Sequence, residues 1–488
     1  MSNLGTLDLI ILVGYAIILL AMGAYFVRRS NTAEGFMVAG RGIPAWAAGL
    51  AIMSAYTSSI SYIATPGKAF DENWHPLVFA LTVPPAAWIA CRYAVSHYRA
   101  NKLISAYEYL ETRLGPWARF YASLSFVLFM IGRMAVILYL AALLLGNFLD
   151  WPIELVILIL GVVTIVYTLM GGMEAVIWTD VIQSAVMVGG GLFCAAYLTY
   201  FVYQDPKPLM AIAAESGKLS LGSLDFSFSS RTVWVMIIYG LTENLRNLVA
   251  DQNYVQKYAA APDEKAAKRA IWISAAIFMP LTALFLYIGT SLYAFYSSEL
   301  HQLAPEIVKG DQVFPYFIAT EVPAGLKGLI IAAILAAAMS TVDSALNCSA
   351  TVTLLDFHKR YINPSISDRN SVKFLRWSTV FWGVLGIGFA TLMVRATSAL
   401  DIWWQIAGIF GGGILGLFLL ALMSRRGVRP WQGIVGIAAS ILVIYWGTFV
   451  RGDAWWQSQI DSILIGTLGT GALLLVVFTL SIIQPKRS

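Results

Sequence analysis

A cluster of polar side chains in an otherwise apolar run could bind a cation. The run from 329 to 346 reads LIIAAILAAAMSTVDSAL and carries three hydroxyls and one carboxylate close together: Ser340, Thr341, Asp343 and Ser344. In hydrocarbon such groups are costly unless they face a partner or an ion. The cluster therefore predicts a bound cation.

The spacing of these residues places several oxygen atoms on one helix face. Ala337, Ser340 and Thr341 follow an i, i+3, i+4 pattern, so a carbonyl and two hydroxyls can reach one ion. Asp343 and Ser344 continue the same polar stripe. Oxygen ligands without sulfur suit a hard cation such as sodium. Close packing of small residues is the alternative, and it explains the alanine and the serines but not the aspartate.

Two further polar segments could contribute to the same chemistry. The stretch 54–61, SAYTSSIS, interrupts a second apolar run, and unwound backbone at membrane depth can offer carbonyls to a cation. Its hydroxyls could equally bond back to the preceding helical turn. Asp180 lies in the segment 171–183, GGMEAVIWTDVIQ, where it is either an interfacial carboxylate or a functional one.

Arg133 lies midway along a long apolar segment, FMIGRMAVILYL, where an unpaired charge is costly. Either Arg133 pairs with Glu243, or its guanidinium awaits the carboxylate of a substrate. Amides and aromatic rings that suit a sugar-like ligand accompany these residues in two later runs: Tyr239, Asn244, Asn247 and Gln405, the last beside Trp403 and Trp404. Tryptophan near a helix end is, however, often an interface anchor.

The elements that position these residues are membrane-spanning helices. The chain has 488 residues, of which 59% are hydrophobic and only 12% charged, and its mean hydropathy is +0.72. Its apolar runs are about twenty residues long, which suits helices crossing about 30 Å of hydrocarbon and not the short alternating strands of a barrel. The fold class is an all-α polytopic membrane protein.

The apolar runs predict thirteen transmembrane helices. They lie near 7–27, 45–64, 76–97, 118–148, 153–171, 177–203, 232–250, 269–296, 325–355, 373–395, 402–424, 430–450 and 459–483. The first is followed by Arg28 and Arg29 and has no cleavage site, so we expect it to be a retained span and not a secretion signal. The longest outer connections, 204–231 and 297–324, are short enough to be caps or small interfacial helices.

The loop charges predict the orientation of the chain, because short cytoplasmic loops are rich in Lys and Arg. Cations fall in alternate connections: Arg28, Arg29, Arg41; Arg99, Lys102, Arg113; Lys257, Lys265, Lys268, Arg269; Lys359, Arg360, Lys373, Arg376; Arg425, Arg426, Arg429; Lys486, Arg487. The opposite connections carry acids: Asp71, Glu72, Asp150, Glu299, Glu306, Asp311, Asp453. We expect the N-terminus outside and the C-terminus in the cytoplasm.

Other function classes fit poorly. The net charge of +5 is scattered over loops, so no nucleic-acid partner is implied. The three cysteines fall in or beside apolar runs and indicate neither a disulfide framework nor a thiolate metal site. An enzyme is disfavoured because no nucleophile–base pair appears and the histidines are scattered: His75, His97, His301 and His358.

The chain resembles the sodium:solute symporter family, which contains sodium/glucose, proline and sialic acid transporters. The resemblance rests on GGMEAVIWTDVIQ and AAAMSTVDSALN, with support from SAYEYLETR at 105–113 and DQNYVQKY at 251–258. It implies a LeuT-like fold of two inverted five-helix repeats in a single transporter domain. The expected parts are an extra first helix (7–27), a first repeat (45–203), a second repeat (232–424) and two C-terminal helices (430–483).

The resemblance also implies two ion sites. The main sodium site of the family matches Ser54 and Thr57 of the broken helix with Ala337, Ser340 and Thr341. A second sodium site, present in some members, matches four positions: Asp180, Ser340, Asp343 and Ser344. Asp343 stands where some members with that site carry Ser, so the site could hold sodium more firmly or carry a proton instead.

For the substrate, Arg133 matches the arginine with which sialic acid transporters hold the carboxylate, and Ser58 and Ser61 match hydroxyl positions of that pocket. Asn73 and Gln405 match polar contacts of sugar carriers. Ala80 replaces an expected glutamine and Tyr56 an expected threonine, which argues against sialic acid itself. Together with Glu243, Asn244 and Asn247, these positions make up the expected substrate site, and a sugar acid or another small organic anion fits them, with a neutral sugar next.

We therefore expect a sodium-coupled symporter of the bacterial inner membrane that imports a small organic solute by alternating access. Sodium is the coupling ion, no cofactor is expected, and no obligate protein partner is implied beyond solute, sodium and the lipid bilayer. A proton-coupled symporter is the nearest alternative. A channel or a sodium sensor on the same fold is a further one, which saturable uptake would exclude.

Overall fold

The structure is a computed structural model. It describes residues 4–27, 30–204, 209–298, 301–305, 307–394, 399–423, 428–452, 454 and 456–483, without the side chains of 59, 60, 147, 209 and 399–409. Several loop charges used above to predict orientation lie outside the described residues: Arg28, Arg29, Glu299, Glu306, Arg425, Arg426, Asp453, Lys486 and Arg487. Within the described part the chain is helical, with one isolated bridge between Arg451 and Ser458 and no strand.

The first half of the chain forms long apolar helices joined by short helical segments. Its elements are α1 (Thr6–Phe26), α2 (Ala33–Val38), the 3₁₀ turn η1 (Ala39–Arg41), α3 (Ala45–Tyr56), α4 (Ser59–Asp71), α5 (His75–Leu81), α6 (Val83–Ile89), the π-helical segment η2 (Ala90–Val95), α7 (Ser96–Ala100), α8 (Ala106–Leu114), α9 (Pro116–Leu149), α10 (Ile153–Gln204) and α11 (Leu209–Glu215).

The second half follows the same plan. Its elements are α12 (Val233–Val249), α13 (Gln252–Ala259), α14 (Glu264–Tyr296), α15 (Gly310–Thr320), α16 (Leu326–Val352), the π-helical segment η3 (Thr353–Ile362), α17 (Asp368–Met393), α18 (Ala399–Met423), α19 (Pro430–Phe449), the 3₁₀ turn η4 (Ser462–Leu464) and α20 (Ile465–Ile483). The small helices expected in 204–231 and 297–324 are confirmed as α11 and α15.

The span predicted at 45–64 is broken where the sequence is richest in hydroxyls. α3 ends at Tyr56, and Thr57 (φ −108°, ψ 100°) and Ser58 (φ −98°, ψ 174°) are extended before α4 begins. Ser and Thr favour such breaks because their hydroxyls compete for backbone hydrogen bonds. The break predicted within SAYTSSIS is confirmed, and it leaves carbonyls at the end of α3 without helical partners.

A second broken helix begins the other half of the chain. α12 ends at Val249, Asp251 is extended (φ −91°, ψ 114°), and α13 follows at once. The two broken helices meet near their breaks, since α13 packs on α3. The prediction that Lys257 is a loop cation is wrong: it lies in α13 and its side chain is fully buried. A polar helix of eight residues resembles a loop in hydropathy, which explains the error.

One element, α10, contains two of the predicted spans. It has 52 residues, about 78 Å at 1.5 Å per residue, which is more than twice the hydrocarbon thickness. Its backbone turns at Gly172 (φ 56°, ψ −151°), between the predicted spans 153–171 and 177–203. A Cβ at this glycine would lie 2.9 Å from the Cα and the carbonyl oxygen of Phe36 in α2. The turn therefore requires glycine for its dihedral angles and for the close approach of α2.

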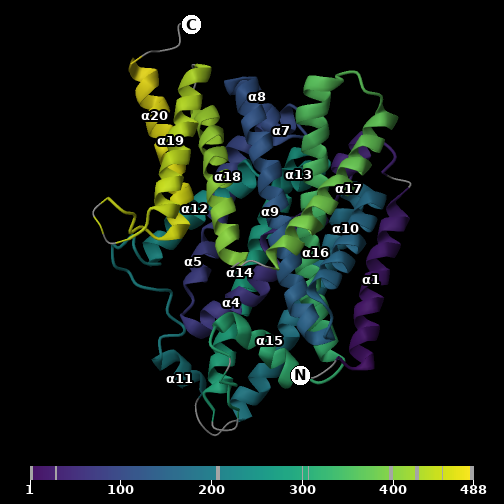
Figure 1. The fold of residues 1–488 in the computed structure, drawn as a ribbon, viewed down its shortest axis with the longest axis vertical. Helices are drawn as coiled ribbons and strands as arrows, with labels where there is room; N and C mark the ends of the chain where they lie inside the picture. Colours follow the sequence, from purple (N-terminus) through teal and green to yellow (C-terminus); the bar gives the residue numbers. More distant parts are fainter. Residues whose placement is uncertain are drawn as a thin grey trace.

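Among the described residues, nine helices are long and apolar enough to cross a membrane, or ten if the bent pair Ala33–Arg41 and Ala45–Tyr56 forms one span. This number is lower than thirteen partly because α10 counts once and α12 is only 17 residues long. The exact number of spans stays a prediction. The beginning of α1 and the end of α20 lie at opposite ends of the bundle (Figure 1), as an odd number requires.

The centre of the bundle is α16, in which nearly every residue is buried. It packs against α1, α9, α10 and α17, and also against both halves of the broken helix, α3 and α4. Figure 1 shows α1 at one edge of the bundle and the pair α19 and α20 at the opposite edge. The polar residues of α16 therefore face other helices and not lipid.

Ion pairs join α8 to α9 and η3. The Arg119 Nη1 lies 2.7 Å from Glu111 Oε2, and its Nε lies 2.7 Å from Asp356 Oδ1. Arg360 Nε donates to Glu111 Oε1 at 2.9 Å. Burial opposes ionisation of Glu111, but the hydrogen bonds from both arginines hold its pKa below the usual value.

Candidate functional site

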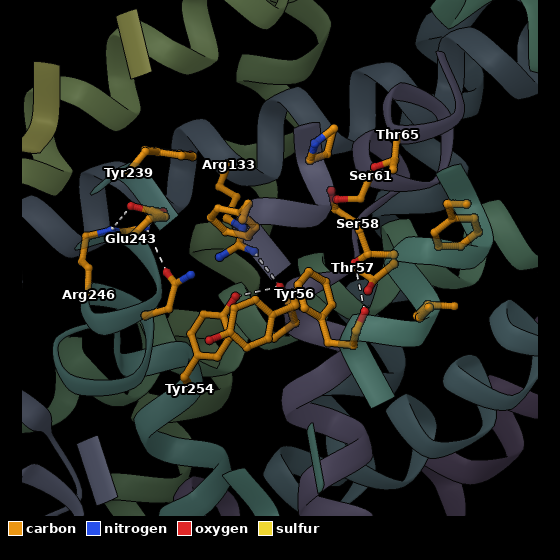
Figure 2. A pocket seen from close by; sticks show the side chains of 18 of the residues that line it. Tyr56, Thr57, Ser58, Ser61, Thr65, Arg133, Tyr239, Glu243, Arg246 and Tyr254 are labelled. Atoms are coloured by element: carbon orange, nitrogen blue, oxygen red, sulfur yellow. Dashed lines mark hydrogen bonds and ion pairs between the residues drawn. The ribbon is translucent and has the colours of Figure 1, made fainter. Parts of the chain in front are cut away.

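A cavity of about 350 Å³ lies beside the break between α3 and α4. Helices α4, α9, α12, α13 and α14 contribute to its wall (Figure 2). The polar residues that line it are Tyr56, Thr57, Ser58, Ser61, Thr65, Arg133, Tyr239, Glu243, Arg246, Asn247, Tyr254 and Thr282. In Figure 2, Ser58 and Ser61 lie toward one end of the cavity, Glu243 and Arg246 toward the other, and Arg133 between them.

Arg133 presents its guanidinium to this cavity. Its Nη2 donates to the Ala55 carbonyl at 3.1 Å, and the Tyr254 hydroxyl donates to the same oxygen at 3.0 Å. Ala55 stands in the last turn of α3, where the break leaves the carbonyl available. Arg133 forms no ion pair within 4.0 Å among the described residues, so most of its N–H groups remain available to an anion.

Glu243 pairs with Arg246 and not with Arg133. The Arg246 Nε donates to Glu243 Oε2 at 2.9 Å, its Nη2 also bonds to the other carboxylate oxygen, and its Nη1 lies 3.6 Å from Asp251 Oδ2. Of the two alternatives for Arg133, the first therefore does not hold in this structure. The i, i+3 spacing of Glu243 and Arg246 is the sequence signal that could have found this pair.

Aromatic rings form one side of the cavity. The Tyr56 ring lies 4.8 Å from that of Tyr254 and 4.9 Å from that of Phe278, measured between ring centroids. Tyr56 is the position where sialic acid transporters are expected to carry threonine. The larger ring narrows the cavity at the end of α3 and offers an apolar face to a ligand.

The predicted substrate residues divide into two groups. Ser58, Ser61, Arg133, Glu243 and Asn247 line the cavity together. Two others do not: Asn73 accepts from the backbone N–H of His75 at 3.0 Å, and Asn244 Nδ2 donates to Thr82 Oγ1 at 2.9 Å. The side chain of Gln405 lies outside the described residues.

The residues of the predicted main sodium site are all buried. Ser340 Oγ and Thr341 Oγ1 both donate to the Ala337 carbonyl, at 3.1 and 3.2 Å, so their oxygen lone pairs remain available. Ser54 Oγ is buried without a hydrogen-bond partner in the described structure. An unsatisfied buried oxygen and oxygens with free lone pairs fit a hard cation. α16 packs on α3 and α4, the elements that carry Ser54 and Thr57.

The second predicted site contains a lysine that the sequence reasoning missed. Lys257 Nζ lies 2.9 Å from Asp180 Oδ2 and donates to the Ala51 carbonyl at 2.9 Å. Both charged side chains are fully buried. Lys257 thus supplies a positive charge to Asp180 and ties α13 to α10 and α3. The signal that could have found it is DQNYVQKY, a motif already noted at 251–258.

Asp343 has a different environment from Asp180. Its Oδ2 accepts from the Tyr167 hydroxyl at 2.8 Å and from Thr179 Oγ1 at 3.4 Å, and its Oδ1 accepts from Ser344 Oγ at 3.2 Å. Two of the four predicted second-site residues, Asp343 and Ser344, are therefore bonded to each other, while Asp180 is bonded to Lys257.

Comparisons with known proteins agree on one family. The model of the sodium:solute symporter family matches residues 36–430. The sodium/sialic acid symporter SiaT of Proteus mirabilis is 32% identical over 91% of this chain and 90% of its own. The corresponding NanT of Aliivibrio fischeri is 30% identical over 97% of this chain and 93% of its own.

Solved structures give the same result. A substrate-bound, outward-open structure of a Na⁺-coupled sialic acid symporter superposes with a TM-score of 0.91 at 29% identity, covering 98% of both chains. A nucleobase-cation-symport-1 family transporter, at 16% identity, superposes with a TM-score of 0.59 over 94% of this chain and 97% of its own. The second likeness concerns the fold alone, which is the LeuT-like fold expected from the sequence.

Proposed function

Because the chain belongs to the sodium:solute symporter family, we propose that it couples sodium to the uptake of a small hydroxylated carboxylate held by Arg133. Sodium-coupled solute symport follows from the family, and the substrate class is the proposal. Two relatives of this chain, NanT and SiaT, are named sodium/sialic acid symporters.

The observation that carries the proposal is the guanidinium of Arg133 in the cavity. The Arg133 side chain is half-buried and forms no ion pair with a carboxylate among the described residues, which is costly in a membrane protein. A substrate carboxylate would offset that cost with paired, charge-assisted hydrogen bonds. The hydroxyls of Ser58 and Ser61 on one side and Glu243 on the other suit a ligand that carries hydroxyl groups.

Sialic acid is the first substrate to test, because two relatives are named for it. Ala80 and Tyr56 depart from the positions expected of its carriers, so smaller sugar acids belong in the same screen. The human sodium-coupled monocarboxylate transporter 1 is 26% identical over 90% of this chain, so monocarboxylates also belong in the screen.

Ion binding is proposed at the main site formed by Ser54, Thr57, Ala337, Ser340 and Thr341. Sodium there would hold the broken helix α3–α4 against α16 and so order the wall of the substrate cavity. A second cation, sodium or a proton, is proposed near Asp343. Sodium and substrate must then raise each other's affinity by the same factor.

The test is a thermal-shift screen of the purified protein, followed by uptake into proteoliposomes. We expect a sugar acid to stabilise the protein only when sodium is present, and Arg133→Gln to lower substrate affinity at least tenfold. Arg92→Gln is the matched control, because it removes the same charge at an exposed position. It should change neither the substrate affinity nor its dependence on sodium. Ser340→Ala should weaken the sodium dependence.

Three outcomes would contradict the proposal. If substrate stabilised the protein equally well without sodium, the proposed sodium coupling would be wrong. If a pH gradient alone drove uptake, the proton-coupled alternative would be favoured. An Arg133→Gln protein that binds the carboxylate as tightly as the wild type would remove the substrate assignment while leaving sodium coupling intact.

A further inference from the structure

A second cavity of about 140 Å³ lies on the other side of the Glu243–Arg246 pair. Four residues line both this cavity and the larger one: Phe129, Tyr239, Glu243 and Arg246. The remaining wall comes from α12, α18, η4 and α20: Thr242, Gly411, Gly412, Leu415, Ser462, Ile463, Gly466, Thr467 and Thr470. The two cavities therefore adjoin at these four residues.

Two glycines leave this space open. A Cβ at Gly466 would meet no atom within 4 Å, and the nearest neighbour of a Cβ at Gly411 would be the Arg246 side chain, at 3.8 Å. A short distance away the backbones of α18 and α20 are in close contact, since a Cβ at Gly412 would lie 2.8 Å from the Gly466 carbonyl oxygen. The cavity therefore depends on the absence of a side chain at Gly411 and Gly466.

The wall presents hydrogen-bond acceptors. Thr242 Oγ1 donates to backbone carbonyls of its own helix, so in its 2.8 Å contact with Thr467 the latter donates and keeps its lone pairs. Thr470 donates to the Gly412 carbonyl at 2.8 Å and likewise keeps its lone pairs. Glu243 adds carboxylate oxygens, whereas Arg246 donates through Nε and Nη2 to Glu243 and Asn247, and its Nη1 lies 3.6 Å from Asp251 Oδ2.

We propose that this cavity is a subsite for the hydroxylated tail of the transported carboxylate. Acceptors on the wall suit hydroxyl donors, and the charge of Glu243 disfavours a carboxylate there. The acid group would therefore bind at Arg133 and the tail would extend past Glu243 toward α20. The subsite rests on the proposed function, because it assigns the far end of the same substrate.

The experiment compares a long and a short acid. N-acetylneuraminate and its analogue lacking the last two carbons of the glycerol chain form one pair, and gluconate and glycerate form another. Gly466→Leu places a side chain in the subsite, and the position tolerates it because an added Cβ would have no neighbour within 4 Å. The dissociation constant of the long acid should rise at least tenfold, while that of the short acid should change less than twofold.

Gly471→Leu is the matched control. This glycine lies on the same helix, its Cβ would also meet nothing within 4 Å, and the residue is exposed. It should change neither constant. Thr467→Val, which removes only the hydroxyl, is a milder second variant and should weaken the long acid alone.

Equal effects of Gly466→Leu on both acids, or no effect on either in a protein that is folded and binds them, would overturn the subsite. Such a result would leave the proposed function standing, because the wild-type protein still binds sugar acids with sodium. A wild-type protein that binds neither pair would overturn both the proposed function and the subsite.

Discussion

At the residue scale, the Ala55 carbonyl connects the two candidate sites. It accepts from Arg133 and from Tyr254, which line the substrate cavity, and it follows Ser54, a predicted sodium ligand, in the chain. A substrate carboxylate at Arg133 and a sodium ion at Ser54 would therefore both act on this end of α3. Tyr254 would then hold the end of α3 in place, which makes it a positioning residue for sodium–substrate coupling.

Tyr254→Phe should reduce that coupling. Loss of one hydrogen bond of about 1 kcal/mol corresponds to about a fivefold smaller effect of sodium on substrate affinity. Titration of substrate at high and low sodium measures the factor directly. Tyr258→Phe is the control: its hydroxyl is also buried on α13 but donates to the Leu248 carbonyl, away from Ala55. An unchanged factor in Tyr254→Phe would exclude the carbonyl as the connection.

The buried pair of Lys257 and Asp180 gives a second residue-scale prediction. Lys257→Met should destabilise the protein by about 3–5 kcal/mol, because it leaves a fully buried carboxylate without its cation. The double variant with Asp180→Asn should recover most of this loss. Denaturation of the purified protein in detergent measures both.

The control for this pair is Lys268→Met. Lys268 pairs with Glu264 at 2.6 Å, but both side chains are partly exposed, so the cost should stay below about 1 kcal/mol. If the two variants Lys257→Met and Asp180→Asn instead had additive costs, the charges would not be acting as a pair.

At the element scale, the breaks in the helices decide the fold. Gly172→Ala should lower stability by about 1–3 kcal/mol or more, because it strains a positive φ and presses a methyl group against the backbone of Phe36. Gly189→Ala on the same helix is the control: it is exposed, its Cβ would meet nothing, and the change should be neutral or stabilising. Melting temperatures of the two variants test this, and equal effects would show that the turn tolerates a side chain.

Several elements could be predicted from the sequence because their signals are local. The hydroxyl-rich stretch 54–61 predicted the broken helix, and Gly171–Gly172 separated two predicted spans at the observed turn. The position of Lys257 could not be predicted in this way. A polar helix buried against α3 and α10 has the composition of a loop, and only the tertiary contacts distinguish the two.

The candidate site was predictable to the same extent. Arg133 was found as a charge in an apolar run, and Ser58 and Ser61 were implied as substrate residues by the family resemblance; all three line one cavity. Asn244 was chosen for its amide, but which way a helical residue faces depends on the neighbouring helix, here α6 with its flanking residue Thr82. The i, i+3 spacing of Glu243 and Arg246 is compatible with an ion pair between them. Only the structure shows that Glu243 pairs with Arg246 and not with Arg133.

At the scale of the whole molecule, the loop charges predict how the chain is oriented in the membrane. The loop charges place 204–231 outside and 356–372 inside. Ser230→Cys should react with a membrane-impermeant maleimide in intact cells, whereas Ser365→Cys should react only after permeabilisation. Both positions are exposed, and the native cysteines are buried, so background labelling should be low. The reverse pattern would invert the assignment of the two faces.

The break between α3 and α4 also has an electrostatic consequence. The peptide dipoles of a helix place roughly half a negative charge at its C-terminal end and half a positive charge at its N-terminal end. The end of α3 therefore attracts a cation, and the start of α4 attracts an anion, although Ser54, Thr57 and Ser58 carry no charge. Because this attraction depends on the direction of the backbone, tilting α3 alone would weaken sodium binding without neutralising any side chain.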